Sequence, residues 1–358
     1  MARTVALPLL VALVLTAGPA CSARGDQPAE PVAAASSGGS PIDERLTPEV
    51  ATSAFRSFVS NDDVARASGD ERLALSWTDD GQAQLTAAQF RRAAFTGDPV
   101  PRYDYSGQKF YVPRLTKYPK WFVVTADRAR KGAKGATKQD VLLAFVRKYP
   151  ESRWRLSLST LLDKKAPEAK KASQIAVDKD GYATPLATFD ISLTIQPRIV
   201  SAMQATLAEE GPASLASKVM RTGPHTSGYY ARDQRNEERD TERGLAYDSV
   251  YTATGFPIYG LRTADGGGLV LYALARDTVT FVKDKARGRL SVPRDAAHLL
   301  DTIVLKDELK VNETLQFAAT VPAKPPGDKS RTPDKNQPKA SVIAADGAVV
   351  MATTSESD

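Results

Sequence analysis

The sequence predicts an α+β fold built from two tandem domains. Apolar residues at helical spacing are followed by runs with strand character, and this order occurs twice along the chain. Short segments of the second half also resemble segments of the first half at nearly constant spacing. A length of 358 residues is sufficient for about two domains of ordinary size. We therefore expect two cone-like domains, each with helices followed by a curved antiparallel sheet.

The composition excludes several classes of protein. Hydrophobic residues make up 42% of the chain and charged residues 25%, which is ordinary globular usage. Global disorder, collagen, a coiled-coil rod and a polytopic membrane protein are thereby excluded. One cysteine cannot form an intrachain disulfide or a multi-cysteine zinc site. Two histidines leave little room for a metal centre, so we expect neither a metal nor a cofactor.

Residues 1–20 read as a secretory signal peptide. The apolar run Val5–Thr16 has the length of a signal-peptide core and is too short to span a bilayer. Small residues precede Cys21, and the segment resembles a bacterial lipobox, although Gly18 and Pro19 depart from the usual residues. The resemblance implies that Cys21 carries the lipid, palmitate included, and becomes the first residue of the mature chain.

Ordinary cleavage after Ala20 or Ala23 is the alternative to lipidation. Residues 21–45 are rich in Pro, Ala, Ser and Gly, and we expect them to form a flexible tether. A lipid on Cys21 would then anchor the protein to the outer face of the cell membrane.

Residues 46–166 form the first expected domain. Thr47 suits a helix N-cap and Pro48 the first helical position, and apolar residues then follow at helical spacing. A basic, glycine-containing loop is expected over Arg128–Lys138. The expected helices are 48–58, 62–75 and 86–94, and the expected strands are 109–115, 120–126, 140–148 and 152–161.

A connecting segment, 167–194, leads to the second expected domain, residues 195–352. Its Lys- and Pro-rich stretch 322–339 predicts a mobile loop, and residues 353–358 a disordered tail. The expected helices are 199–207 and 213–220, and the expected strands are 249–252, 256–261, 269–275, 278–282, 315–321, 341–345 and 349–351.

Two local matches suggest that the domains arose by duplication. Phe110–Leu115 resembles Phe256–Leu261, and Trp121–Ala126 resembles Leu269–Leu274. The second segment of each pair begins 146 and 148 positions after the first. Two unrelated α+β domains are the alternative, because each match is short.

In element order, residues 47–165 and 195–350 each resemble the nuclear-transport-factor-2-like (cystatin-like) cone, without any shared residue motif. The layout is also similar to uncharacterised secreted lipoproteins of high-GC Gram-positive bacteria. The residues that carry this second resemblance are Ala20-Cys21-Ser22, Tyr111–Leu115 with Trp121-Phe122, and Asp180-Gly181-Tyr182. It implies a location at the cell envelope and no particular chemistry.

We find no catalytic motif. His225 lies in a turn sequence, and its alternative is a pair with Ser227. His298 looks like part of a short helix with an exposed imidazole. Gly266–Gly268 precedes a strand, which favours a hairpin turn over a phosphate-binding loop, and Asp178–Gly181 reads as a turn rather than a calcium loop.

Three features remain as candidate surfaces or pockets. Arg232–Arg243 carries four arginines and five acids, which predicts a solvated, ion-paired segment or, alternatively, a partner surface. The 322–339 loop could touch anionic lipid or wall polymer, and its lack of aromatic residues argues against nucleic acid. A group of aromatic residues could line the mouth of a cone or fill its core: Tyr103, Tyr105, Tyr111, Trp121, Phe122 and Trp154.

We therefore expect a lipid-anchored extracytoplasmic protein with a binding or scaffolding role at the cell envelope. The alternatives are an enzyme that uses an acid–base pair in a cone pocket, and a solute-binding lipoprotein, whose usual βαβ units are missing from this pattern. A deep pocket with convergent polar groups would favour the enzyme, and a filled cone would favour the scaffold.

Overall fold

The first helix begins where the sequence predicts. In the computed structural model, which describes residues 45–133, 135, 137–302, 304–325 and 337–356, Thr47 is the N-cap of α1 (Pro48–Ser68). Its hydroxyl accepts a hydrogen bond from Val50 N at 3.3 Å. The helix continues through the break expected before residue 62 and ends at Gly69, whose φ of 70° suits a glycine cap. The described residues belong to one compact unit that begins at Asp43.

The first half contains three helices and four strands in the predicted order. β1 begins six residues earlier than predicted, at Tyr103, and β2 reaches Arg130, so Arg128 lies in a strand and not in the expected loop. The elements after α1 are α2 (Glu71–Ser76), α3 (Asp80–Thr96), β1 (Tyr103–Tyr111), β2 (Lys120–Arg130), β3 (Gln139–Arg147) and β4 (Arg155–Leu162).

The second half again places helices before strands, which confirms the α+β class. The helix expected over 213–220 is wrong: Gly211 and Pro212 interrupt the helical hydrogen bonds and lie in one short 3-10 turn, Gly211–Ala213, and a second, Leu215–Lys218, follows. The strands expected at 269–275 and 278–282 are one strand. The elements are α4 (Val200–Glu210), α5 (Ser227–Glu242), β5 (Leu245–Ala253), β6 (Tyr259–Arg262), β7 (Gly268–Val282), η5 (Ala297–Leu299), β8 (Glu308–Val321) and β9 (Ser341–Ser355).

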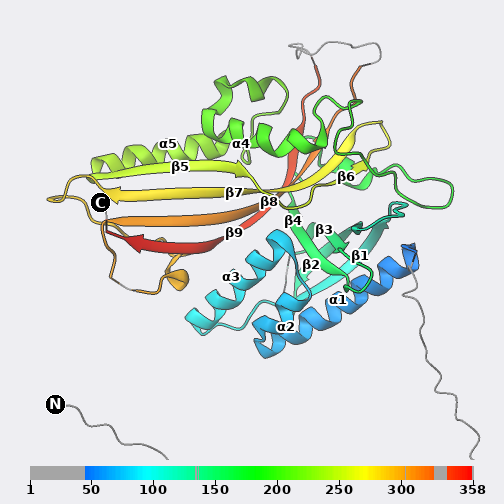
Figure 1. The fold of residues 1–358 in the computed structure, drawn as a ribbon, viewed down its shortest axis with the longest axis horizontal. Helices are drawn as coiled ribbons and strands as arrows, with labels where there is room; N and C mark the ends of the chain where they lie inside the picture. Colours follow the sequence, from blue (N-terminus) through cyan, green and yellow to red (C-terminus); the bar gives the residue numbers. More distant parts are fainter. Residues whose placement is uncertain (1–44, 134, 136, 303, 326–336, 357–358) are drawn as a thin grey trace, which may run out of the picture. The chain divides into compact units, whose positions relative to one another are not determined.

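The strands of both halves join into one antiparallel sheet in the order β1-β2-β3-β4-β9-β8-β7-β5, with β6 beside β7 (Figure 1). The last strand of each half forms the junction. Only two residue pairs make this β4–β9 ladder, Leu161 with Ala345 and Leu162 with Ala344. The two sets of strands are therefore continuous at a short seam, whereas the sequence predicts a separate sheet for each half.

Strand register repeats between the halves. Tyr111 pairs with Val123 at the β1–β2 edge, and Tyr259 pairs with Leu271 at the β6–β7 edge. Each residue of the second pair lies 148 positions after its counterpart, which matches the spacing seen in the sequence. The second half splits its edge strand into β5 and β6, so β5 occupies the place of the start of β1. This common register supports duplication.

Several clusters of apolar residues stabilise the sheet, and three of them join it to α1, to α4 and across the two halves. Helix α1 packs Phe55 and Phe58 against β2 and β3, and α4 packs Leu207 against β7 and β8. A third cluster contains residues of both halves: Tyr111, Val123, Leu142, Ala144, Val146 and Leu158 from the first, with Tyr259, Leu261, Leu269, Leu271, Ala318 and Ile343 from the second. The two halves thus share an apolar layer besides the strand seam.

The connecting segment 167–194 contacts both halves of the chain. Pro185 forms a β-bridge with Leu261, and Ala183 forms one with Pro113. Several predicted features lie outside the described residues: the signal peptide, Cys21, the tether up to residue 44, and positions 326–336 and 357–358. Among the described helices, none combines the length and apolar character needed to cross a membrane.

Candidate cavity between the helices and the sheet

A cavity of about 680 Å³ lies in the first half, between helices α1 and α3 and the sheet. Its walls come from α1, α3, β1, β2 and β4, and also from η5 and β9 of the second half. This volume is within the range of small-molecule sites. The polar residues of its lining include Asp62, Arg66, Gln82, Gln89, Tyr103, Tyr105, Arg128, Ser159, His298 and Asp346.

One wall is held by a buried ion pair on α1. Arg66 Nε donates to Asp62 Oδ2 at 2.6 Å, and both side chains are 6% exposed. Arg66 also donates to Gln89 Oε1 at 2.5 Å and to the Pro101 carbonyl at 3.0 Å, which ties α1 to α3 and to the start of β1. Burial raises the pKa of Asp62, and the charges of Arg66 and Arg128 oppose that rise. The second oxygen of Asp62, Oδ1, is buried without a hydrogen-bond partner.

Arg128 is a half-buried cation of this cavity without a contacting carboxylate among the described residues. Its guanidinium lies 4.5 Å from the ring centroid of Tyr103, and no hydrogen bond or ion pair joins that guanidinium to another described side chain. Its Nε atom is buried and without a partner. An arginine cannot neutralise itself by losing a proton, so its charge is a permanent feature of the cavity.

Two ionisable groups face this cation from different elements. Asp346 on β9 accepts a hydrogen bond from Gly347 N at 2.8 Å; burial raises its pKa and the Arg128 charge opposes the rise. Burial also raises the pKa of Tyr105 on β1 to about 12. The arrangement therefore combines a fixed positive charge with a carboxyl group that can be a hydrogen-bond donor when protonated.

His298 is not exposed as the sequence suggested. Its short helix, η5, packs beside α3, and the imidazole lines the cavity with both ring nitrogens shielded from solvent. Burial lowers the pKa of His298. Gln82 Oε1 on α3 is a further buried atom without a partner. Polar atoms left without partners gather on one cavity here, which is the arrangement expected where a ligand or water completes the bonding.

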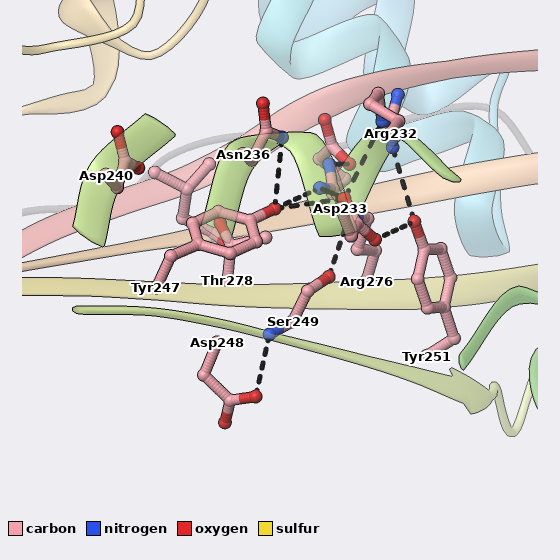
Figure 2. A network of polar contacts seen from close by, with 12 residues as sticks. Arg232, Asp233, Asn236, Asp240, Tyr247, Asp248, Ser249, Tyr251, Arg276 and Thr278 are labelled. Carbon is pink, nitrogen blue, oxygen red and sulfur yellow. Dashed lines mark hydrogen bonds and ion pairs between the residues drawn. The ribbon is translucent and has the colours of Figure 1, made fainter. Parts of the chain in front are cut away.

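The second half contains a closed counterpart of this arrangement around Arg276 (Figure 2). Arg276 is 6% exposed and lies under α5, where it donates to Asp233 Oδ1 at 2.6 Å and to Glu313 Oε2 at 2.7 Å. It also donates to Tyr247 Oη at 2.6 Å and to Ser249 Oγ at 3.1 Å. Every nitrogen of this guanidinium is thus bonded.

The predicted aromatic residues do not gather at one site. Tyr103 and Tyr105 line the cavity. Tyr111 is buried in the layer shared by the two halves, and Trp121 packs beside it with its ring centroid 5.4 Å from that of Tyr259. Trp154 packs on the α1 side of the sheet, where its ring lies 5.1 Å from that of Phe122.

Other motifs have structural surroundings. The Gly266–Gly268 segment connects β6 to β7 as a hairpin, and Asp178 accepts hydrogen bonds from the backbone of Asp180 and Tyr182 in a turn. His225 precedes α5, and burial lowers its pKa. The charged stretch from Arg232 is helical, and its Asp233 turns inward to Arg276.

No cluster of three or more potential metal-ligating side chains occurs in the described ranges. Sequence reasoning also missed Arg128, Asp346 and Arg276 as site residues. A signal existed for the two arginines, because both follow the repeated strand segments at the same 148-residue spacing.

A family described as "Domain of unknown function (DUF8094)" matches residues 43–353. The chain belongs to this family. It is 28% identical over 286 residues to an uncharacterised lipoprotein of Streptomyces coelicolor, covering 78% of this chain and 79% of the relative. It is 26% identical over 292 residues to an uncharacterised lipoprotein of Streptomyces avermitilis, covering 79% and 81%. No solved structure matches significantly.

Proposed function

We propose that this protein is an extracytoplasmic lipoprotein that binds a small molecule in the cavity of its first half. The observation that carries the proposal is the cavity itself, in which unpartnered polar atoms of Asp62, Gln82 and Arg128 converge. We further propose that each half is a cone of the nuclear-transport-factor-2-like type, and that the second is closed by the Arg276 network. Scaffolding alone would not require an open, polar cavity.

The lipoprotein relatives support an anchor on Cys21. We propose that the lipid on this residue holds the binding domain at the outer face of the cell membrane. In the native host, Cys21→Ser should release the protein into the medium or leave it unprocessed. If the Cys21→Ser variant fractionates with membranes and has the same mass as the processed wild type, the lipid anchor is wrong, and the cavity proposal is unaffected.

A neutral fluorescent probe tests the cavity. We expect 1-N-phenylnaphthylamine to bind the chain from Ser22 to Asp358 saturably, with one site per chain. Ala88 on α3 lines the cavity and is 4% exposed, so Ala88→Phe should fill the space and abolish the binding. Ala67→Phe, at an exposed position of α1 away from the lining, is the matched control. Equal probe binding by Ala88→Phe and the control, with equal unfolding midpoints, would overturn the proposal.

Acid–base catalysis is the second candidate function. It is favoured by two carboxyl groups, Asp62 and Asp346, whose pKa values burial raises in the same cavity as Tyr105. Mass spectrometry of small molecules that copurify with the protein distinguishes the two functions. If the protein is an enzyme, Asp346→Asn should retain the unconverted substrate, whose mass differs from that of the molecule held by the wild type. If the protein only binds, the variant and the wild type should hold the same molecule.

A further inference from the structure

An arginine–tyrosine pair occurs at equivalent places in the two halves. Tyr105 on β1 pairs in register with Arg128 on β2, and Tyr251 on β5 pairs in register with Arg276 on β7. Arg276 lies 148 positions after Arg128, which is the offset of the paired strands themselves. The two guanidinium groups therefore belong to equivalent strand positions, and they differ in the side chains that contact them.

Two carboxylates meet Arg276. Asp233 arrives from α5, and Glu313 stands opposite Arg276 on the neighbouring strand β8. The residue opposite Arg128 on the corresponding strand β3 is Gln139, which carries no charge. In the second half the protein itself thus supplies the anions that neutralise the buried guanidinium.

The cavity leaves the equivalent place at Arg128 open. Asp62 is engaged by Arg66 at 2.6 Å, and Asp346 lies outside the 4 Å range of an ion pair with Arg128. The remaining charges of the lining are exposed and balance one another in sign, with Arg92 and Arg130 against Asp98 and Asp295. A fixed, half-buried cation without a contacting carboxylate favours an anionic partner with planar, bidentate geometry.

We propose that the cavity binds a small amphiphilic carboxylate, whose carboxylate occupies at Arg128 the place that Asp233 and Glu313 occupy at Arg276. This inference rests on the proposed small-molecule function and names the class of ligand. Five larger apolar side chains of the mixed lining provide hydrocarbon contacts for the body of such a ligand: Phe58, Leu85, Leu156, Leu161 and Val349.

Displacement of the neutral probe by matched ligands tests the inference. Decanoate and decanamide share a chain and differ in charge. We expect decanoate to displace 1-N-phenylnaphthylamine at a concentration lower by about tenfold or more, since a charge-assisted hydrogen bond contributes at least that factor. Arg128→Gln should remove this preference while keeping decanamide and probe binding. Arg198→Gln is the control, because Arg198 stacks on Phe189 at 4.3 Å outside the cavity lining.

The outcomes separate the two proposals. Absence of saturable probe binding, or binding unchanged by Ala88→Phe, rejects the small-molecule function itself. Probe binding that is displaced equally by decanoate and decanamide leaves the cavity function standing and rejects the carboxylate. A decanoate preference that survives Arg128→Gln with the same magnitude also rejects the role of Arg128.

Discussion

Substitution of the two equivalent arginines should have very unequal consequences for stability. In Arg276→Met, the side chains of Asp233 and Glu313, which are 13% and 18% exposed, lose the cation that contacts each of them within 2.7 Å. Asp233 keeps Arg232 at 3.7 Å, whereas Glu313 loses the cation that contacts it. Breaking a buried pair by removing one partner costs about 3–5 kcal/mol, because the remaining charge, here that of Glu313, stays buried without compensation. Arg128→Met removes no hydrogen bond or ion pair among the described residues and should change the free energy of unfolding by less than about 1 kcal/mol.

Urea unfolding followed by circular dichroism measures the difference. With a denaturant slope of about 3 kcal/mol/M, the Arg276→Met midpoint should fall by about 1 M or more while the Arg128→Met midpoint stays near the wild type. Adding Asp233→Asn and Glu313→Gln to Arg276→Met should recover part of the loss, because the stranded charges disappear. Equal midpoints for the two arginine variants would refute the distinction between a closed network and an open site.

Three further predictions concern pH, domain structure and the long loop. Asp346→Asn should raise the free energy of unfolding at pH 7, because burial raises the pKa of Asp346 and the ionised carboxylate therefore destabilises the folded state. The gain should shrink as the pH falls toward 3.8, since the wild-type carboxyl group then becomes protonated. A gain that stays the same in urea titrations from pH 7 to pH 4 would contradict this. Residues 45–166 should fold alone with a cooperative thermal transition. The midpoint should be lower than that of the full chain, because Val123, Leu142 and Leu158 lose their apolar contacts with the second half. A fragment that is disordered by circular dichroism would show that the halves depend on each other. Replacing residues 326–336 by a short Gly/Ser link should leave the thermal midpoint nearly unchanged, since loop-closure entropy varies slowly with length, and a loss of several kcal/mol would speak against a dispensable loop.

Local signals were sufficient for much of the fold. Thr47 and Pro48 define a helix start by chemistry that needs no distant partner, and the cap hydrogen bond is present. The strands around Trp121 and Val141 were predictable because their apolar runs are flanked by turn residues. The 148-residue repeat was also visible, because equivalent strands keep similar apolar patterns.

The candidate site was less predictable because its residues resemble loop residues. Arg128 opens a basic, glycine-containing stretch, yet pairing with Tyr105 continues β2 through it. The expected strands 341–345 and 349–351 leave out Asp346 and Gly347, but these two residues lie in the middle of a long ladder with β8. The β4–β9 seam joins Leu161 to Ala345, and no local pattern specifies a contact between residues so distant in sequence.

The position of β9 has a consequence for biogenesis. An exported chain crosses the membrane from its N-terminus, so α1, α3 and β1–β4 emerge long before the strand that carries Asp346 and Val349. The wall that these residues supply is therefore the last part of the cavity to arrive, after the first half and after Asp295 and His298 at η5. Until then β4 presents an open edge to the exterior. Binding competence would thus mark a fully translocated chain, and a premature stop before residue 346 would remove one wall of a cavity whose first-half walls were finished about 180 residues earlier.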